Sequence, residues 1–305
     1  MNTAMPSASE DPTEDRMRGV GLSSENSLIC RRRQWFAKLH LMLARQRDGK
    51  TRFTHCEHAG PLRVQRLFHP DDSGSAHCYL LHPPGGVATG DELEIRATLS
   101  SGKALITTPS AGRFYTVEGC PDGQIQRVEL DVREGHLQWL PQETILFAGA
   151  RAQLDTKVTL APDTRLSFWD VITLGKPACG ELFTEGSLDQ TLRIEREDRS
   201  VFCDRIQLQA GDRLHRSRMG LNGCSTIGTC VLTAEAPESL LDDWLSETTA
   251  DSDGSYSVTQ RGELLIARYL GDDAQRCRHY FARLLERVAA GCYNEAFTIP
   301  RIWHT

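Results

Sequence analysis

Four acidic residues stand where a β-structure would hold their side chains partly buried. Asp170 lies inside an otherwise apolar run, and the others lie beside turns rich in proline or glycine. A partly buried carboxylate requires a hydrogen-bond donor, a cation or a proton. Structural salt bridges would meet that need, and so would a passage in which single carboxylates hold a hydrated cation loosely and release it. The four candidates for such a passage are Asp91, Glu143, Asp170 and Glu181.

Histidine and cysteine form a second group of candidate ligands, which spans residues 55–82. Imidazole and thiolate groups are good ligands for nickel and zinc. However, His55 and His58 are three residues apart, and a strand would place them on opposite faces. No C-x-x-C or H-x-x-x-H spacing indicates a closed metal site. Surface and core histidines are the simpler interpretation, and a labile, open metal site stays as an alternative. The group contains His55, Cys56, Glu57, His58, His69, His77, Cys78 and His82.

Other common catalytic patterns are absent from the chain. It contains no G-x-x-x-x-G-K-[ST] phosphate loop and no G-x-G-x-x-G between a strand and a helix. It also lacks the G-x-S-x-G nucleophile elbow of serine hydrolases. The sequence therefore argues against an NTPase and against a nucleophilic triad.

One corner positions the first of the four acids. Residues 78–82 form a short apolar run typical of a strand, and the two prolines that follow end it because they have no backbone N–H for a sheet ladder. The glycines at positions 85, 86 and 90 permit the positive φ angles of a tight turn. Residues 91–99 then alternate polar and apolar side chains, which predicts a half-buried strand that begins with Asp91.

The chain repeats this alternation from residue 35 onward. Short alternating segments recur roughly every 10–15 residues between glycine, proline or aspartate turns. Residues 237–245 and 272–291 have helical spacing instead. The sequence therefore predicts a mainly β, sandwich-like single domain over residues 29–305, with two α-helices near the C-terminal third. Residues 1–28 are polar and predict a disordered tail.

Composition narrows the class of protein further. The formal net charge of −6 argues against a general nucleic-acid binder. No apolar run approaches the roughly 18–20 residues that cross a bilayer, and the N-terminus lacks the apolar region of a secretory signal. We therefore expect a cytoplasmic protein without membrane partners. The ten cysteines are scattered, so we expect mostly buried thiols and no disulfide framework.

Six short blocks, in order along the chain, resemble the signature of the urease accessory protein UreD (UreH) family. They run from about residue 35 to residue 303. Three of them are residues 60–65, residues 139–144, and residues 174–181 with Gly186. The other three contain His82, Pro83, Pro84, Gly85, Gly86, Gly90 and Asp91; Thr107, Thr108, Phe114 and Tyr115; and Pro300, Arg301, Ile302 and Trp303.

The resemblance implies a non-enzymatic maturation factor with a helically wound stack of strands. It implies binding to the urease apoprotein, a complex with UreF and UreG, and help in bringing nickel to the urease active site. No tightly bound cofactor is expected, and Ni²⁺ would be transient cargo. Arg301, Ile302 and Trp303 are the candidates for docking on a partner. The alternative is a metal-dependent hydrolase on a β fold that uses the histidines of residues 55–82.

Overall fold

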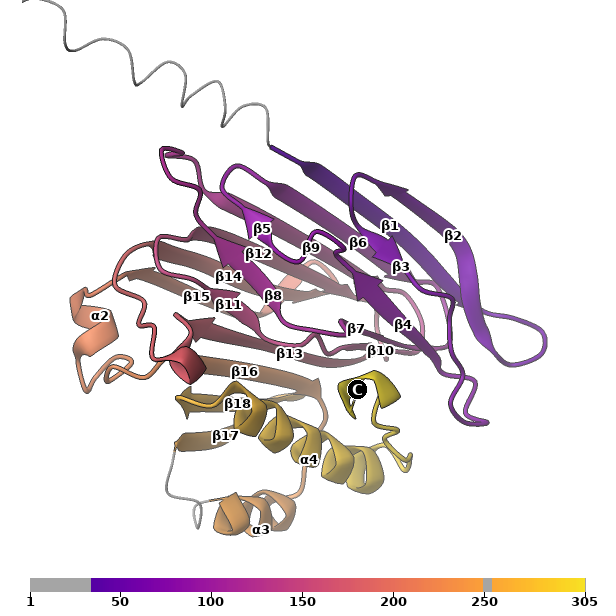
Figure 1. The fold of residues 1–305 in the computed structure, drawn as a ribbon. Coiled ribbons are helices and arrows are strands. Elements are labelled where there is room, and N and C mark those ends of the chain that lie inside the picture. The colour runs from indigo at the N-terminus through magenta and orange to yellow at the C-terminus, as the bar shows by residue number, and fades with distance from the viewer. Residues whose placement is uncertain (1–33, 249–253, 305) are drawn as a thin grey trace, which may run out of the picture.

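Two β-sheets stack face to face, and helices cover the outer face of one of them (Figure 1). The computed structural model describes residues 34–248 and 254–304. The first sheet has the spatial order β15–β14–β12–β9–β6–β1–β2 among the described strands. Its strands are β1 (Phe36–Arg45), β2 (Thr51–Ala59), β6 (Glu92–Leu99), β9 (Gln124–Val132), β12 (Arg151–Leu160), β14 (Ser187–Arg196) and β15 (Arg199–Gln209).

The second sheet has the order β17–β18–β16–β13–β10–β7–β4–β3, and the short strands β5, β8 and β11 join it beside β13. Its members are β3 (Arg63–Val64), β4 (Ala76–Leu81), β5 (Val87–Ala88), β7 (Lys103–Thr107), β8 (Gly112–Tyr115), β10 (His136–Trp139), β11 (Thr144–Leu146), β13 (Arg165–Leu174), β16 (Thr226–Thr233), β17 (Ser255–Arg261) and β18 (Leu264–Gly271).

The chain winds between the two sheets in successive coils. Each coil places one strand in the second sheet, one short strand at the side and one strand in the first sheet: β4–β5–β6, then β7–β8–β9, then β10–β11–β12. Equivalent strands of neighbouring coils pair in parallel. The predicted mainly β fold with helically wound strands is therefore confirmed.

Alternation along each strand explains why the coils stack in this register. Leu39, Leu41 and Leu43 on β1 point inward and are at most 1% exposed, whereas the residues between them face outward. Leu93 and Ile95 on β6 do the same beside them, as their alternation predicts. A slip of one residue would turn every apolar side chain to the wrong face, so burial of one face fixes the pairing.

The helices form a third layer on the outer face of the second sheet. Helix α4 (Ala274–Cys292) begins at Asp273, whose carboxylate accepts the backbone N–H of Arg276 at 3.0 Å. Its buried stripe, which includes Phe281 and Leu284, packs on this sheet. Helix α3 (Glu238–Thr248) packs beside it through Trp244, whose ring lies 4.1 Å from that of Tyr280. Both predicted helices are confirmed.

Three shorter helical turns complete the described elements, and none was expected from periodicity. A one-turn helix has too few residues to show an apolar repeat. None of the described helices is long and apolar enough to span a bilayer. The turns are η1 (Pro177–Cys179), α2 (Arg213–Arg216) and η2 (Arg301–His304).

The cysteines follow the prediction only in part. Eight of the described cysteines are free thiols, but only Cys78, Cys230 and Cys277 among them are buried, so the expectation of mostly buried thiols is wrong. Cys120 is disulfide-bonded. Burial raises the pKa of Cys78 and Cys230 well above the ordinary range, which keeps these thiols protonated and inert. The predicted tail over residues 1–28 lies outside the described residues.

Candidate functional site

The predicted corner lies where β4 turns toward β6. Gly85 and Gly90 have φ angles of 82° and 87°, so both take the left-handed conformation that glycine permits. Gly86 is required for a different reason. A Cβ at this position would lie 2.6 Å from the ring of Tyr115 on β8, so the corner packs directly against the next coil.

Asp91 holds this corner together. Its side chain is buried, and its two carboxylate oxygens accept the backbone N–H groups of Trp35 at 2.8 Å and Ala88 at 2.9 Å. Asp91 therefore links the residue before β1 to the turn before β6 through these two hydrogen bonds. The neighbouring His82 is half-buried; burial lowers its pKa, and the negative charge of Asp91 opposes that shift.

A small cavity of about 120 Å³ opens inside this corner, between the two sheets. Apolar side chains such as Leu93 and Trp139 form most of its wall, and Gln126 on β9 adds an amide. None of the four candidate acids lines it. The motif residues that line it include His82, Gly85, Gly86 and Thr108.

Asp170 is the candidate acid that points between the sheets. It lies on the same face of β13 as Phe168 and Ile172, which are buried in the core, yet it retains some solvent-accessible surface. Its carboxylate accepts the Nε2–H of Gln190 on β14 at 2.6 Å. Burial raises its pKa to about 6, although the bonds from Gln190 and the backbone of Val171 favour the ionised form.

Polar side chains continue from Asp170 toward solvent. In the strand register Asp170 lies opposite Thr229 on β16, which lies opposite Arg268 on β18. The Arg268 guanidinium donates to Thr229 at 2.9 Å and pairs with Asp204 of the first sheet at 2.5 Å. Its side chain is 38% exposed, so this row runs from the interior to the edge of the sandwich.

The same row extends from Asp170 toward the corner cavity. Gln126, Leu154 and Gln190 are in register across β9, β12 and β14. One strand, β12, lies between the two glutamines, so their backbones are roughly 10 Å apart. Neither glutamine is fully buried, whereas Leu154 between them is 4% exposed. We call the set Gln126, Asp170, Gln190, Asp204, Thr229 and Arg268 the interior polar row.

Glu143 lies outside this row and has a partner of its own. It forms an ion pair with Arg278 of α4, and both side chains are largely buried. Burial lowers the pKa of Arg278 to about 10. This pair fastens the helix layer to the loop before β11, which is a structural contact.

Glu181 lies on the surface, where its carboxylate is 2.6 Å from the Nζ of Lys176 and its side chain is 57% exposed. The described structure therefore does not bring the four predicted acids around one cavity. Asp91 clamps a corner, Asp170 points into the interior, Glu143 pairs with α4, and Glu181 faces solvent.

The three C-terminal residues predicted to dock on a partner also differ in their surroundings. The Trp303 indole N–H donates to the hydroxyl of Thr107 at 2.9 Å, and its ring lies 5.2 Å from that of Trp169. Trp303 therefore covers the second sheet of its own chain. Ile302 is half-buried, and Arg301 is exposed.

The histidines of residues 55–82 do not form one site. His55 and His58 lie on opposite faces of β2, as their spacing predicts. His69 contacts the backbone oxygen of Thr51 at 2.8 Å, and His77 is buried in β4. His82 belongs to the corner.

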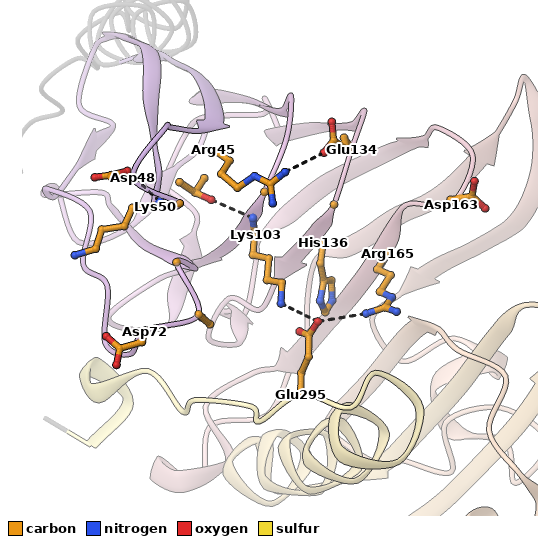
Figure 2. Close-up of a pocket in the computed structure, with 16 residues that line it drawn as sticks. Arg45, Asp48, Lys50, Asp72, Lys103, Glu134, His136, Asp163, Arg165 and Glu295 are labelled. Carbon is orange, nitrogen blue, oxygen red and sulfur yellow. Dashed lines mark hydrogen bonds and ion pairs between the residues drawn. The ribbon is translucent and has the colours of Figure 1, made fainter.

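A larger pocket of about 590 Å³ lies at one end of the coils, and it contains none of the predicted site residues (Figure 2). Lys103 and Arg165 converge there on the carboxylate of Glu295, at 2.7 and 3.4 Å. His136 lies beside them with its Nε2 2.8 Å from the hydroxyl of Ser167. Burial, together with the two cations, lowers the His136 pKa to about 3, so the ring stays neutral.

Known proteins resemble this chain over nearly its full described length. The profile of the family described as "UreD urease accessory protein" matches residues 36–304. The urease accessory protein UreD of Saccharophagus degradans is 39% identical over 278 residues, which cover 90% of this chain and 94% of that protein. The corresponding protein of Dechloromonas aromatica is 38% identical over 279 residues, 89% of this chain and 95% of the relative. This chain therefore belongs to the UreD family of urease accessory proteins, which gives it a role in urease maturation.

Proposed function

We propose that this protein is a non-enzymatic chaperone of urease that helps nickel reach the active site of the apoprotein. It acts in the cytoplasm, in a complex with UreF, UreG and the urease subunits. Ni²⁺ passes through it as transient cargo and is not retained as a cofactor. Family membership supports the maturation role, and the relatives carry the names of accessory proteins.

The observation that carries the nickel proposal is the interior carboxylate of Asp170. No ion pair to Asp170 is formed by the described residues, and its hydrogen-bond donors are neutral groups, the amide of Gln190 and the backbone N–H of Val171. A carboxylate in such surroundings destabilises the fold when it ionises, so its presence suggests a use for its charge. A passing divalent cation would find one anionic ligand there, with amide and hydroxyl oxygens from Gln190 and Thr229 nearby.

The interior polar row supplies the rest of the route in this proposal. It would lead the hydrated ion from the corner cavity past Asp170 to the edge of the sandwich at Asp204. Single oxygen ligands with water between them hold a divalent ion more weakly than a closed cage does, which suits transfer. Asp91 and Glu143 contribute by holding the corner and the helix layer, and Arg301 stays the exposed candidate for docking on UreF.

The test replaces Asp170 by asparagine, which keeps the shape and the bond from Gln190 but removes the charge. Urease would be expressed with its accessory proteins, and its specific activity and nickel content measured. We expect Asp170→Asn to lower activation by roughly tenfold, equivalent to about 1.4 kcal/mol in a barrier. Glu181→Gln, at the solvent-facing acid, is the matched control and should leave activation unchanged.

Removal of an unpaired interior charge should make Asp170→Asn at least as stable as the parent. A loss of activation would therefore not reflect unfolding, and denaturant titration checks this point. Full activation by Asp170→Asn, or an equal loss with Glu181→Gln, would refute passage along the interior polar row. The maturation role would then rest on docking.

A further inference from the structure

Three metal-ligating side chains lie together on the outer face of the first sheet, away from the interior polar row. They are His40 on β1 and His55 and Glu57 on β2. One ligand atom from each lies within 4.8 Å of the other two. The rings of His40 and His55 have centroids 5.1 Å apart, and His55 Nε2 lies 3.5 Å from a carboxylate oxygen of Glu57.

A β-bulge brings these side chains to one face. Phe53 pairs with Leu43 and packs against the core, so regular alternation would also turn His55 inward. The register shifts between Met42 and Leu43, and the extra residue in β2 places His55 opposite Met42 and Glu57 opposite His40. A one-residue shift moves every following side chain to the other face of the sheet.

The ligand set fits a divalent ion of the first transition row. Two imidazole nitrogens and one carboxylate oxygen suit Ni²⁺, Zn²⁺ or Cu²⁺ better than Mg²⁺ or Ca²⁺. Ligands about 2.1 Å from a tetrahedral ion lie roughly 3.4 Å apart. The pair His55 and Glu57 already has this separation, and the ligand atom of the half-buried His40 lies within 4.8 Å of both.

Nearby charges do not oppose a cation there. Arg96 lies beside His40 in the register, but its guanidinium pairs with Glu94 at 2.9 Å and Glu129 at 3.1 Å. Strand β2 is the edge strand of its sheet, and the side chains of His55 and Glu57 are 43% and 74% exposed. The remaining coordination positions face solvent, so a bound ion could be exchanged readily.

We propose that His40, His55 and Glu57 form a labile surface site for a first-row divalent cation. The site is separate from the proposed interior passage. Its test measures metal binding to the purified chain, and the outcome does not depend on whether Asp170 affects urease activation.

Equilibrium dialysis of the purified full-length chain against NiCl₂, repeated with ZnCl₂, tests the proposal. We expect His40→Ala/His55→Ala to bind one metal equivalent fewer than the parent chain. Each single alanine variant, and Glu57→Gln, should weaken the binding of that metal ion by at least about 10-fold, since losing even an outer-shell partner of a metal ligand costs on the order of 10–100-fold. His58→Ala is the matched control, since His58 is exposed on the same strand but lies on the opposite face.

Because the readout is a difference between variants, metal bound elsewhere on the chain does not disturb it, and circular dichroism confirms that each variant is folded. Equal metal binding by the double variant and the parent would overturn the proposal. An equal loss in His58→Ala would also overturn it, because it would show dependence on histidine number rather than on this geometry.

Discussion

Asp91 acts at the scale of a single residue as a clamp on two backbone segments. Its replacement by alanine leaves the N–H groups of Trp35 and Ala88 without their acceptors. Hydrogen bonds to a charged group contribute about 1.5–3 kcal/mol each, so we expect Asp91→Ala to lower the free energy of unfolding by roughly 3 kcal/mol. Asp91→Asn keeps one acceptor oxygen and should cost about half as much. Urea titration measures both.

The adjacent acid provides the control for this prediction. Glu92 pairs with Arg127 at 3.1 Å, and both side chains are more than 40% exposed. Such a surface ion pair contributes about 0–1 kcal/mol, so Glu92→Ala should have a small effect. If the two alanine variants lost equal stability, the clamp assigned to Asp91 would be wrong.

Asp170 predicts a specific dependence of stability on pH. Its pKa is about 6 in the folded protein and 3.8 as a free side chain. Between these values the folded state holds the proton that the unfolded state has lost, so the contribution of Asp170 to stability is greatest below pH 4 and falls as pH rises through 6. The decrease should reach about 3 kcal/mol, at 1.36 kcal/mol per pKa unit.

Asp170→Asn isolates this effect, because other groups titrate equally in both proteins. The difference in unfolding free energy between the variant and the parent should widen from pH 4 to pH 7, in favour of the variant. Urea titrations at several pH values test it. Parallel curves would mean that the Asp170 carboxyl has an ordinary pKa in the folded state.

At the scale of elements, the contact of α4 with β16 depends on one glycine. A Cβ at Gly228 would lie 2.3 Å from the sulfur of Cys277 and 2.9 Å from the ring of Phe281. Overpacking of this kind costs about 1–3 kcal/mol, so we expect Gly228→Ala to lower the melting temperature. Cys277→Ala in the same chain should recover part of the loss by removing the sulfur.

The double variant is the informative measurement, because residues in contact give non-additive effects. Thermal unfolding of the two single variants and the double variant yields the coupling. Additive losses would mean that Gly228 and Cys277 do not constrain each other.

Local pattern was enough to predict the strands, the corner and both longer helices, because each depends on alternation, glycine and proline chemistry or helical spacing. Asp170 could be singled out because it interrupts an apolar run. Its position in the interior polar row could not be predicted. Gln190 reaches it from the opposite sheet, and Thr229 and Arg268 fall in line with it only because strands distant in sequence pair. Glu143 and Arg278 are paired across two layers, which no local spacing encodes.

His55 and Glu57 could be named as candidate ligands from the sequence, but their position beside His40 could not, for a related reason. Alternation alone places His55 and Glu57 on the inner face, and the bulge after Phe53 reverses this. A bulge leaves little trace in composition, so faces that follow one cannot be assigned from spacing.

At the scale of the whole molecule, the order of the coils along the chain is also their order in space (Figure 1). Each newly synthesised coil therefore meets a neighbour that is already complete and can pair with it at once. The outer face of the second sheet, with Trp169 and Val171, is covered by α4 and Trp303, which are synthesised last. A chain interrupted before residue 274 would thus present an uncovered apolar surface to other proteins, and premature termination should lead to aggregation rather than to a shorter working protein.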